Sequence, residues 1–258
     1  MGTLVCFHAH PDDEAIGTGG TIAKAVKAGH RVVLVTATRG EQGEYPEGLL
    51  AAGETLGARR EEEMAAAVDV LGIDRHVFLG YEDSGMVGTP ENENPASFWQ
   101  ADLEEAAERL ATILREERAD VLTVYDENGI YGHPDHIKVW QVGVRAAELV
   151  GTPKVYEATI NRTAWQRRAA ASDQVDQEIR TMETPLGTEE QFITTAVDVR
   201  DFIDVKKAAM KAHKSQITDE SFFMTLPDEV FAEGFGTEWF ILRGAPAGIH
   251  EYDLFAGL

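Results

Sequence analysis

The sequence lacks the features that mark membrane, secreted and nucleic-acid-binding proteins. No apolar run reaches the roughly 18 residues of a transmembrane helix. The N-terminus has no basic segment followed by an apolar run and a cleavage site, so we expect no signal peptide and a cytoplasmic location. Basic residues are scarce: 23 against 45 acidic ones give a net charge of -22. A field of this sign repels phosphate backbones and anionic lipids, so we expect neither a nucleic-acid nor a membrane partner.

Cysteine is also scarce, since Cys6 is the only one in the chain. One cysteine cannot form an intrachain disulfide, which suits a reducing compartment. Cys6 lies between Val5 and Phe7 in an apolar run, which indicates a core position rather than a nucleophile. The chain has 258 residues, 43% hydrophobic and 26% charged, the composition of a globular protein with a well-filled core.

The hydrophobic pattern predicts an α/β fold, because short apolar runs alternate with helical segments. The predicted strands cover residues 4–7, 31–36, 77–79, 121–125 and 155–159. The predicted helices cover residues 21–28, 59–71, 97–118 and 134–150. This alternation is typical of a Rossmann-like, mostly parallel sheet with helices on both faces.

The pattern changes beyond residue 160. A polar stretch at 172–190 is followed by a predicted helix at 205–216 and a predicted strand at 239–242. No pattern assigns a role to residues 170–194. We interpret residues 1–258 as a single domain, with a core of about 1–160 and a C-terminal elaboration of about 161–258.

A cluster of ionisable side chains follows the first predicted strand. Residues 8–14 read His-Ala-His-Pro-Asp-Asp-Glu, at the strand end where open α/β sheets place their ligand sites. Such crowding favours a bound divalent cation. His10 and Asp13 are three residues apart across Pro11, so they can converge on one ion. The same acidic run also fits the N-terminal cap of a helix.

A second cluster follows the fourth predicted strand, where residues 125–136 contain another His-Pro-Asp. His133 and His136 are spaced i, i+3 across a predicted helix start, so both can face one cavity. Alone, this run fits a capped helix start equally well. The conjunction of two such turns on one sheet edge is the stronger signal.

Two imidazoles and one carboxylate form a zinc set with an open position, as catalytic sites require. Taking His10, Asp13 and His136 as that set leaves Asp12 and His133 unassigned. Amide hydrolysis needs two such groups: a base for the attacking water, and a group that stabilises the oxyanion or protonates the amine.

The chain resembles the LmbE-like, or PIG-L, de-N-acetylases, and within them most closely the deacetylases and conjugate amidases of the mycothiol pathway. The matching segments lie at residues 10–14, 60–63, 83–86, 125–136 and 213–216. The resemblance implies that His10, Asp13 and His136 hold Zn²⁺, although Fe²⁺ suits the same ligands. It also implies that Asp12 is the general base.

The resemblance assigns further roles. His133 would stabilise the oxyanion and protonate the leaving amine, with Asp135 keeping it protonated near neutral pH. Tyr131 would help to polarise the substrate carbonyl. Arg60 and Asp83 would grip sugar hydroxyls; taken alone, they also fit a helix-surface charge and a turn residue.

The implied substrate is a small N-acylated amino sugar of the N-acetylglucosaminyl type. Amide cleavage of a mycothiol-type conjugate is a rival reading, but the conjugate amidases carry a lysine just after the first motif, and residues 15–20 contain none. Deacetylation of a secondary-metabolite intermediate is a second rival, and a non-catalytic sugar- or metal-binding module is a third. The sequence leaves the oligomeric state open.

Overall fold

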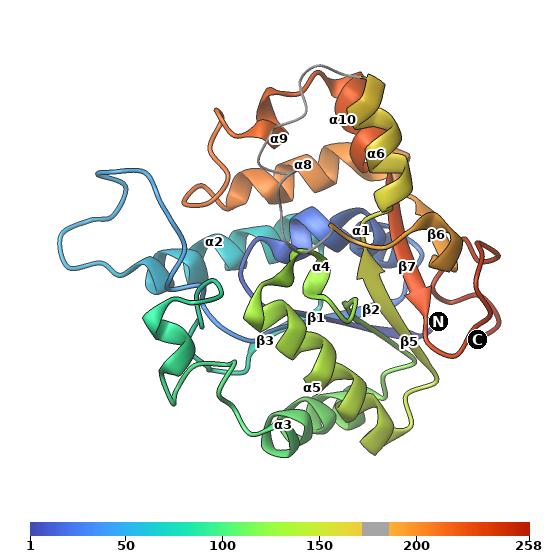
Figure 1. Cartoon of the computed structure of the whole chain (residues 1–258), viewed down its shortest axis with the longest axis horizontal. Coiled ribbons are helices and arrows are strands. Elements are labelled where there is room, and N and C mark those ends of the chain that lie inside the picture. The colour runs from blue at the N-terminus through green and yellow to red at the C-terminus, as the bar shows by residue number, and fades with distance from the viewer. Residues whose placement is uncertain (172–185) are drawn as a thin grey trace.

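A seven-stranded sheet forms the centre of the computed structural model, which describes residues 1–171 and 186–258 (Figure 1). Its strand order is β3-β2-β1-β4-β5-β7-β6. The strands are β1 (Thr3–His8), β2 (Arg31–Thr36), β3 (Arg75–Phe78), β4 (Val121–Tyr125), β5 (Lys154–Thr159), β6 (Thr195–Asp198) and β7 (Thr237–Leu242). The first five strands in this order are parallel, and β7 and β6 continue the sheet antiparallel. The predicted α/β class and mostly parallel sheet are therefore confirmed.

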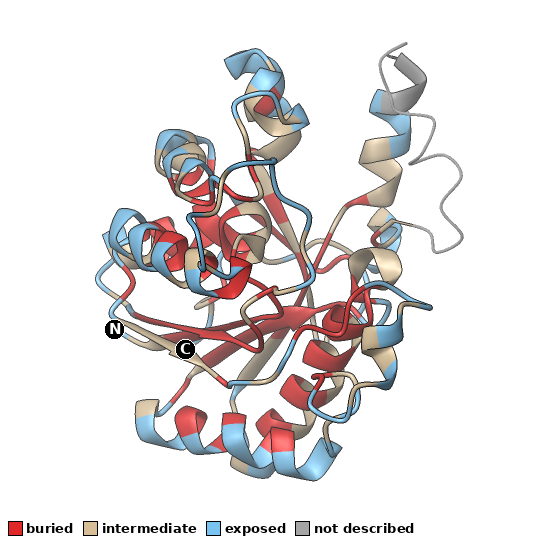
Figure 2. Cartoon of the chain, turned by 90° about the vertical axis from the view of Figure 1, so that its left-hand side faces the viewer, coloured by how far each residue is buried: buried red, intermediate tan, exposed pale blue. Residues whose placement is uncertain are grey.

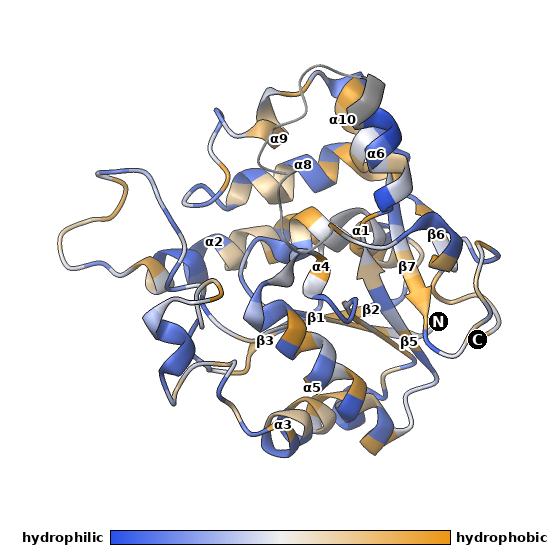
Figure 3. Cartoon of the chain, in the orientation of Figure 1, coloured by the Kyte–Doolittle hydropathy of each residue, from blue (hydrophilic) through white to orange (hydrophobic). Residues whose placement is uncertain are grey.

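Helices cover both faces of the sheet, as predicted (Figure 1). One face carries α3 (Leu103–Glu117) and α5 (Pro134–Val150), and the other carries α1 (Gly19–Lys27), α2 (Leu56–Leu71) and α8 (Ile203–Ala212). The helices bury the side that faces the sheet and expose the other (Figure 2). Their apolar residues follow the same division (Figure 3).

The strand β1 is buried on both sides because its side chains alternate between two cores. Val5 and Phe7 join the core under α3 and α5. Leu4 and Cys6 join the opposite core, which also contains residues of the C-terminal part, such as Phe231.

The helix boundaries follow local capping groups. The helix α2 begins three residues before its predicted start, because Thr55 caps it by accepting the amide of Ala58, and it ends at Gly72. The predicted start of α3 at residue 97 is wrong. Asp102 caps that helix at the amide of Glu105, and the preceding residues form turns.

The C-terminal part adds to the same sheet. The predicted late strand is present as β7, whereas β6, α6 (Arg162–Ala171), α9 (Phe222–Thr225) and α10 (Asp228–Phe235) were not predicted. The helix predicted at 205–216 ends at Ala212. Of the polar stretch, residues 172–185 lie outside the described residues. Among the helices of the described residues, none combines the length and apolarity needed to cross a membrane.

A buried ion pair fastens the C-terminal part to the first helix. Glu238 on β7 accepts the amides of Gly20 and Thr21 at 2.9 and 2.8 Å, and Lys206 on α8 lies 2.5 Å from the same carboxylate. Because Gly20 and Thr21 lie at the N-terminus of α1, the carboxylate satisfies donors that the helix itself leaves unpaired.

Candidate metal centre

The centre of the sheet is a topological switch point. The chain leaves β1 towards β2 on one side and leaves β4 towards β5 on the other, while β1 and β4 are paired in parallel. Open α/β sheets bind ligands in the crevice that this divergence creates at the carboxyl ends of the strands. Both His-Pro-Asp turns, at residues 10–12 and 133–135, follow these two strands, so the structure brings the two predicted clusters together.

Asp13 lies between the two histidines of the predicted ligand set. Its Oδ2 is 3.5 Å from His10 Nδ1, and its Oδ1 is 3.4 Å from His136 Nε2. The backbone amide of His10 also donates to Oδ2 at 2.8 Å, which fixes the carboxylate. The two histidines are buried, and Asp13 is nearly so. The three residues are therefore in contact, with Asp13 in the middle.

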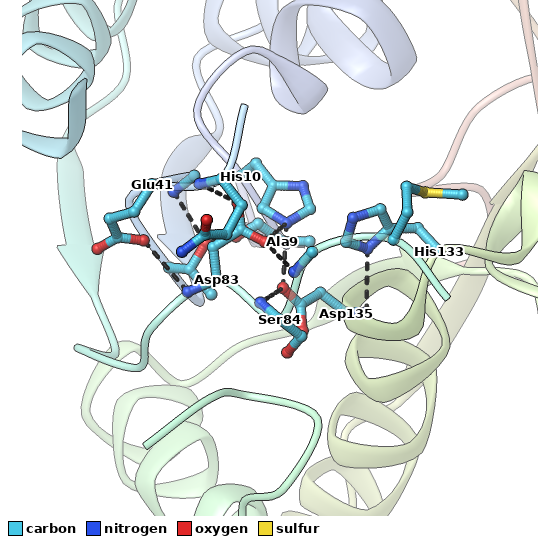
Figure 4. A network of polar contacts seen from close by, with 12 residues as sticks. Ala9, His10, Glu41, Asp83, Ser84, His133 and Asp135 are labelled. Atoms are coloured by element: carbon cyan, nitrogen blue, oxygen red, sulfur yellow. Dashed lines mark hydrogen bonds and ion pairs between the residues drawn. The ribbon is translucent and has the colours of Figure 1, made fainter. Parts of the chain in front are cut away.

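Two triads among the described residues have ligand atoms within 4.8 Å of one another: His10 with His133 and His136, and His10 with Asp83 and Asp135. The second triad is visible in Figure 4. Its carboxylate oxygens already accept backbone amides: Asp83 Oδ1 from Gly85 at 2.9 Å, and Asp135 Oδ2 from Ser84 at 3.0 Å. His10 belongs to both groups, so an ion bound by either group would have His10 as a ligand.

The charges around these imidazoles favour a cation. Burial opposes protonation of His10, yet the carboxylates of Asp83, Asp13 and Asp135 raise its pKa well above the usual value. Burial likewise opposes ionisation of Asp13, but His136 and His10 hold the pKa of this carboxyl well below its usual range. Nitrogen and carboxylate donors crowded around one point form the ligand chemistry that suits zinc or Fe(II).

Asp12 lies beside this cluster in a strained backbone conformation, with φ of 112°. Its amide donates to Glu14 Oε2 at 3.0 Å, and Glu14 in turn is 2.6 Å from His213 Nε2. Arg60 Nη2 lies 3.3 Å from the Asp12 carboxylate. Burial raises the pKa of Asp12 to about 6, against the opposing charge of Arg60. The carboxylate is therefore mostly ionised at neutral pH.

The surroundings of His133 favour a neutral imidazole, which differs from our expectation that Asp135 keeps it protonated. Its Nδ1 accepts the backbone amide of Asp135 at 3.1 Å. Burial and the charges of His10 and His136 lower the pKa of His133 to about 3. The Asp135 carboxylate contacts His10 at 3.1 Å and both donors of Ser84 instead (Figure 4). His133 can thus offer only an Nε2–H donor.

Arg60 braces two loops against each other. Its guanidinium donates to the Gly40 carbonyl at 2.9 Å and to the Pro11 carbonyl, while Nε has no partner among the described residues. Gly40 has φ of 67°, and a Cβ there would collide with the guanidinium. The sequence predicted a substrate contact for Arg60. Its hydrogen bond to the Pro11 carbonyl adds a second role, which is to hold the backbone next to Asp12.

The remaining predicted residues also lie at the site. The Tyr131 hydroxyl is 3.5 Å from His136 Nε2. Asp83 accepts the amide of Gln42 at 3.1 Å through its second oxygen. Together with His10, Asp12 and His136, they line one cavity of about 780 Å³, a volume that suits a ligand larger than one amide group.

Sequence reasoning missed the residues behind the ligands. The ring of Tyr125 stacks on His136 with centroids 4.2 Å apart, and its hydroxyl is 2.9 Å from His8 Nδ1 and 3.2 Å from the Ala9 amide. The signal that could have found Tyr125 and His8 is that both residues end buried strands next to the ligand turns. Ser84, which contacts Asp135, gave no comparable signal beyond its place in a matching segment.

This fold and this cluster define an α/β protein with a metal-capable site at its switch point. The model of the GlcNAc-PI de-N-acetylase (PIG-L) family matches residues 5–147. A 1D-myo-inositol 2-acetamido-2-deoxy-alpha-D-glucopyranoside deacetylase from Acidothermus cellulolyticus is 45% identical over 99% of this chain and 95% of its own. The chain belongs to the PIG-L family, and its curated relatives are N-deacetylases, which hydrolyse amides.

Solved structures share the fold at lower identity. The N,N'-diacetylchitobiose deacetylase of Pyrococcus horikoshii is 22% identical, with a TM-score of 0.61 over 93% of this chain and 83% of its own. A 4-carboxy-2-hydroxymuconate hydratase from Pseudomonas putida gives the same TM-score at 18% identity, over 95% and 97% of the two chains. Since a hydratase shares the fold, the activity must be argued from the site.

Proposed function

We propose that this chain hydrolyses the acetamide of a 2-acetamido-2-deoxy-glucoside, releasing acetate and an amino sugar, with His10, Asp13 and His136 holding a zinc ion. The observation that carries this proposal is Asp13 in contact with both imidazoles, with Asp12 ionised next to it. The relative from Acidothermus cellulolyticus supplies the substrate class. Fe(II) suits the same donors.

The ligand set is preferred over the second triad for a reason of hydrogen bonding. Asp13 Oδ1 accepts no backbone amide among the described residues and lies 3.4 Å from His136 Nε2, whereas the facing oxygens of Asp83 and Asp135 are occupied by backbone amides. Zinc, when bound, supplies a Lewis acid that polarises the carbonyl and makes water more acidic.

The residues beside the ligands divide the proton transfers. Asp12 takes a proton from the attacking water as its oxygen bonds to the carbonyl carbon, and delivers it to the nitrogen as the C–N bond breaks. His133 donates its Nε2–H to the oxyanion, and the hydroxyl of Tyr131 acts on the same oxygen. Asp135 orients His133 through its backbone amide rather than through its carboxylate. Arg60 and Asp83 contact the sugar hydroxyls from the cavity wall.

The experiment is acetate release from 1D-myo-inositol 2-acetamido-2-deoxy-alpha-D-glucopyranoside by metal-loaded protein, with the metal content measured in parallel. Asp12→Asn should retain about one metal per chain and lose at least a hundredfold in kcat. Asp13→Ala should lose the metal. Full turnover by Asp12→Asn would contradict the assigned base, and metal retention by Asp13→Ala would contradict the ligand set.

The conjugate amidase reaction differs only in the acyl group removed. A parallel assay with a thiol-sugar conjugate separates it from the deacetylase. We favour acetate release because curated relatives that are 40–45% identical to this chain are named as deacetylases.

A further inference from the structure

The cavity has two chemically unlike arms on opposite sides of the proposed metal site. Residues that follow β2 and β3, such as Gln42, Asp83 and Glu91, make one arm polar. Trp165 on α6 and Trp239 on β7 make the other arm aromatic. Because the sheet order is β3-β2-β1-β4-β5-β7, the β1 and β4 turns separate the two arms.

The geometry of the proposed substrate uses both arms. In a 2-acetamido-2-deoxy-glucoside the amide is on C2, flanked by the C3 hydroxyl on one side and the glycosidic C1 on the other. When the hydroxyls from C3 onwards face Asp83 and Arg60, the group attached to C1 points away from them. It then lies over β5 and β7, roughly 5–10 Å along the sheet from β4.

The aromatic arm also contains hydrogen-bond donors without partners. Asn161 lines the cavity and is only 2% exposed. Its Oδ1 accepts the Ala164 amide at 2.9 Å, and its Nδ2 has no partner among the described residues. Trp165, one turn further along α6, has an unpartnered Nε1 in the same region of the described chain. A hydrocarbon acyl chain would give neither donor an acceptor, whereas a ring with hydroxyl groups supplies acceptors once either buried N–H turns towards the cavity.

We propose that Asn161, Trp165 and Trp239 form a subsite for the group on C1, and that this group is a hydroxylated ring. Trp239 pairs with Thr159 in the sheet, so it lies next to the turn that carries Asn161. The indole faces pack against the C–H faces of the ring, and the two N–H groups that have no partner in the described part of the chain turn to donate to its hydroxyls. This inference rests on the proposed function, since it assumes that the amide lies at the metal cluster.

The test compares two α-glycosides of 2-acetamido-2-deoxy-glucose, one with myo-inositol on C1 and one with methyl. The wild type should prefer the inositol glycoside in kcat/KM. Asn161→Asp keeps the acceptor that caps α6 but removes the Nδ2 donor, and Trp165→Phe removes only the indole N–H and part of the ring. Each variant should lower the inositol-to-methyl ratio about threefold to tenfold, the loss of one hydrogen bond, with the methyl glycoside unchanged.

Trp140→Phe is the matched control. Trp140 is half-buried and donates Nε1 to Glu157 at 2.8 Å, and neither residue lines the cavity, so the ratio of Trp140→Phe should stay at the wild-type value. A ratio that is unchanged in both test variants would overturn the subsite. A third substrate, the methyl glycoside with an N-hexanoyl group in place of N-acetyl, tests the acyl alternative. If the two variants lower kcat/KM only for this substrate, the arm holds the acyl group and the subsite is overturned.

Dissociation constants of the two glycosides, measured by calorimetry on the same proteins, separate the two proposals. If the wild type releases no acetate from either glycoside, the proposed deacetylation is wrong, and the ratio of dissociation constants still decides the subsite. If acetate is released but Asn161→Asp and Trp165→Phe change neither the kcat/KM ratio nor the ratio of dissociation constants, the subsite alone is wrong.

Discussion

The two His-Pro-Asp turns contain the same tripeptide but are held in different ways. The β4 turn is stabilised locally: His133 caps the start of α5, and Asp126 accepts the amides of Asn128 and Ile130. The β1 turn is stabilised by distant residues. Its Asp12 has φ of 112°, and its Glu14 pairs with His213, 199 residues further along the chain.

The difference shows what is needed to hold the strained backbone of Asp12, the proposed general base. Asp12 occupies a backbone region that L-residues rarely adopt, and such strain persists only where the surroundings over-determine it. Glu14 on the amide and Arg60 on the carboxylate and on the Pro11 carbonyl provide that support. The β4 turn supplies ligands and donors; local caps hold His133 and the residues after Asp126, and Ser84 holds the Asp135 carboxylate.

The largest effect is expected from Glu14→Ala, which removes the support of the β1 turn. It leaves the buried His213 without its carboxylate and the Asp12 amide without its acceptor, so the free energy of unfolding should fall by about 3–5 kcal/mol. Glu14→Gln retains an acceptor and should lose less. Urea unfolding of both variants and of the wild type measures this. If both variants are as stable as the wild type, neither the charge nor the hydrogen bonds of Glu14 matter much for stability.

A smaller effect is expected from Gly40→Ala, because the new Cβ would displace the Arg60 guanidinium. The positive φ costs about 1–2 kcal/mol by itself. Gly53→Ala is the matched control, since Gly53 also has a positive φ but has open space around it. Acetate release should fall in Gly40→Ala and not in Gly53→Ala. Equal activity of the two variants would contradict the role of Arg60 in positioning Asp12.

On the β4 side, Ser84→Ala tests the support of Asp135. Ser84 Oγ donates to Asp135 and accepts the amide of Trp99 at 2.8 Å, and it is fully buried. Its loss should reduce the free energy of unfolding by about 1–3 kcal/mol, the penalty for buried groups left unpaired. The metal content should stay near that of the wild type, because Ser84 contacts none of the proposed ligands except through Asp135. Loss of the metal would move Asp135 into the ligand set.

The same contrast explains what the sequence could predict. The helix α5 coincides with its predicted range because Pro134 and the cap at His133 are local signals. The sheet edge and both His-Pro-Asp clusters followed from periodicity and motif position. Neither the φ of Asp12 nor the pairing of Glu14 with His213 has a local signal, because each depends on packing between distant segments. The neutral state of His133 was missed for the same reason: the direction of the Asp135 carboxylate is set by Ser84.

The smallest effect is expected at Cys6, which lies in β1, the strand that leads into the β1 turn. Burial raises the pKa of this thiol to about 12, and Cys6 is fully inaccessible. Because only the thiolate reacts, a thiol reagent at pH 8 should not label the native protein, whereas the unfolded chain, with an ordinary thiol pKa of about 8.5, should react readily. Mass spectrometry after timed labelling measures this. Glu14→Ala should speed labelling by the same factor by which it raises the unfolding equilibrium constant if β1 opens only with global unfolding. Fast labelling of the wild type would instead show that β1 opens locally, and that the support of the first turn does not extend to its strand.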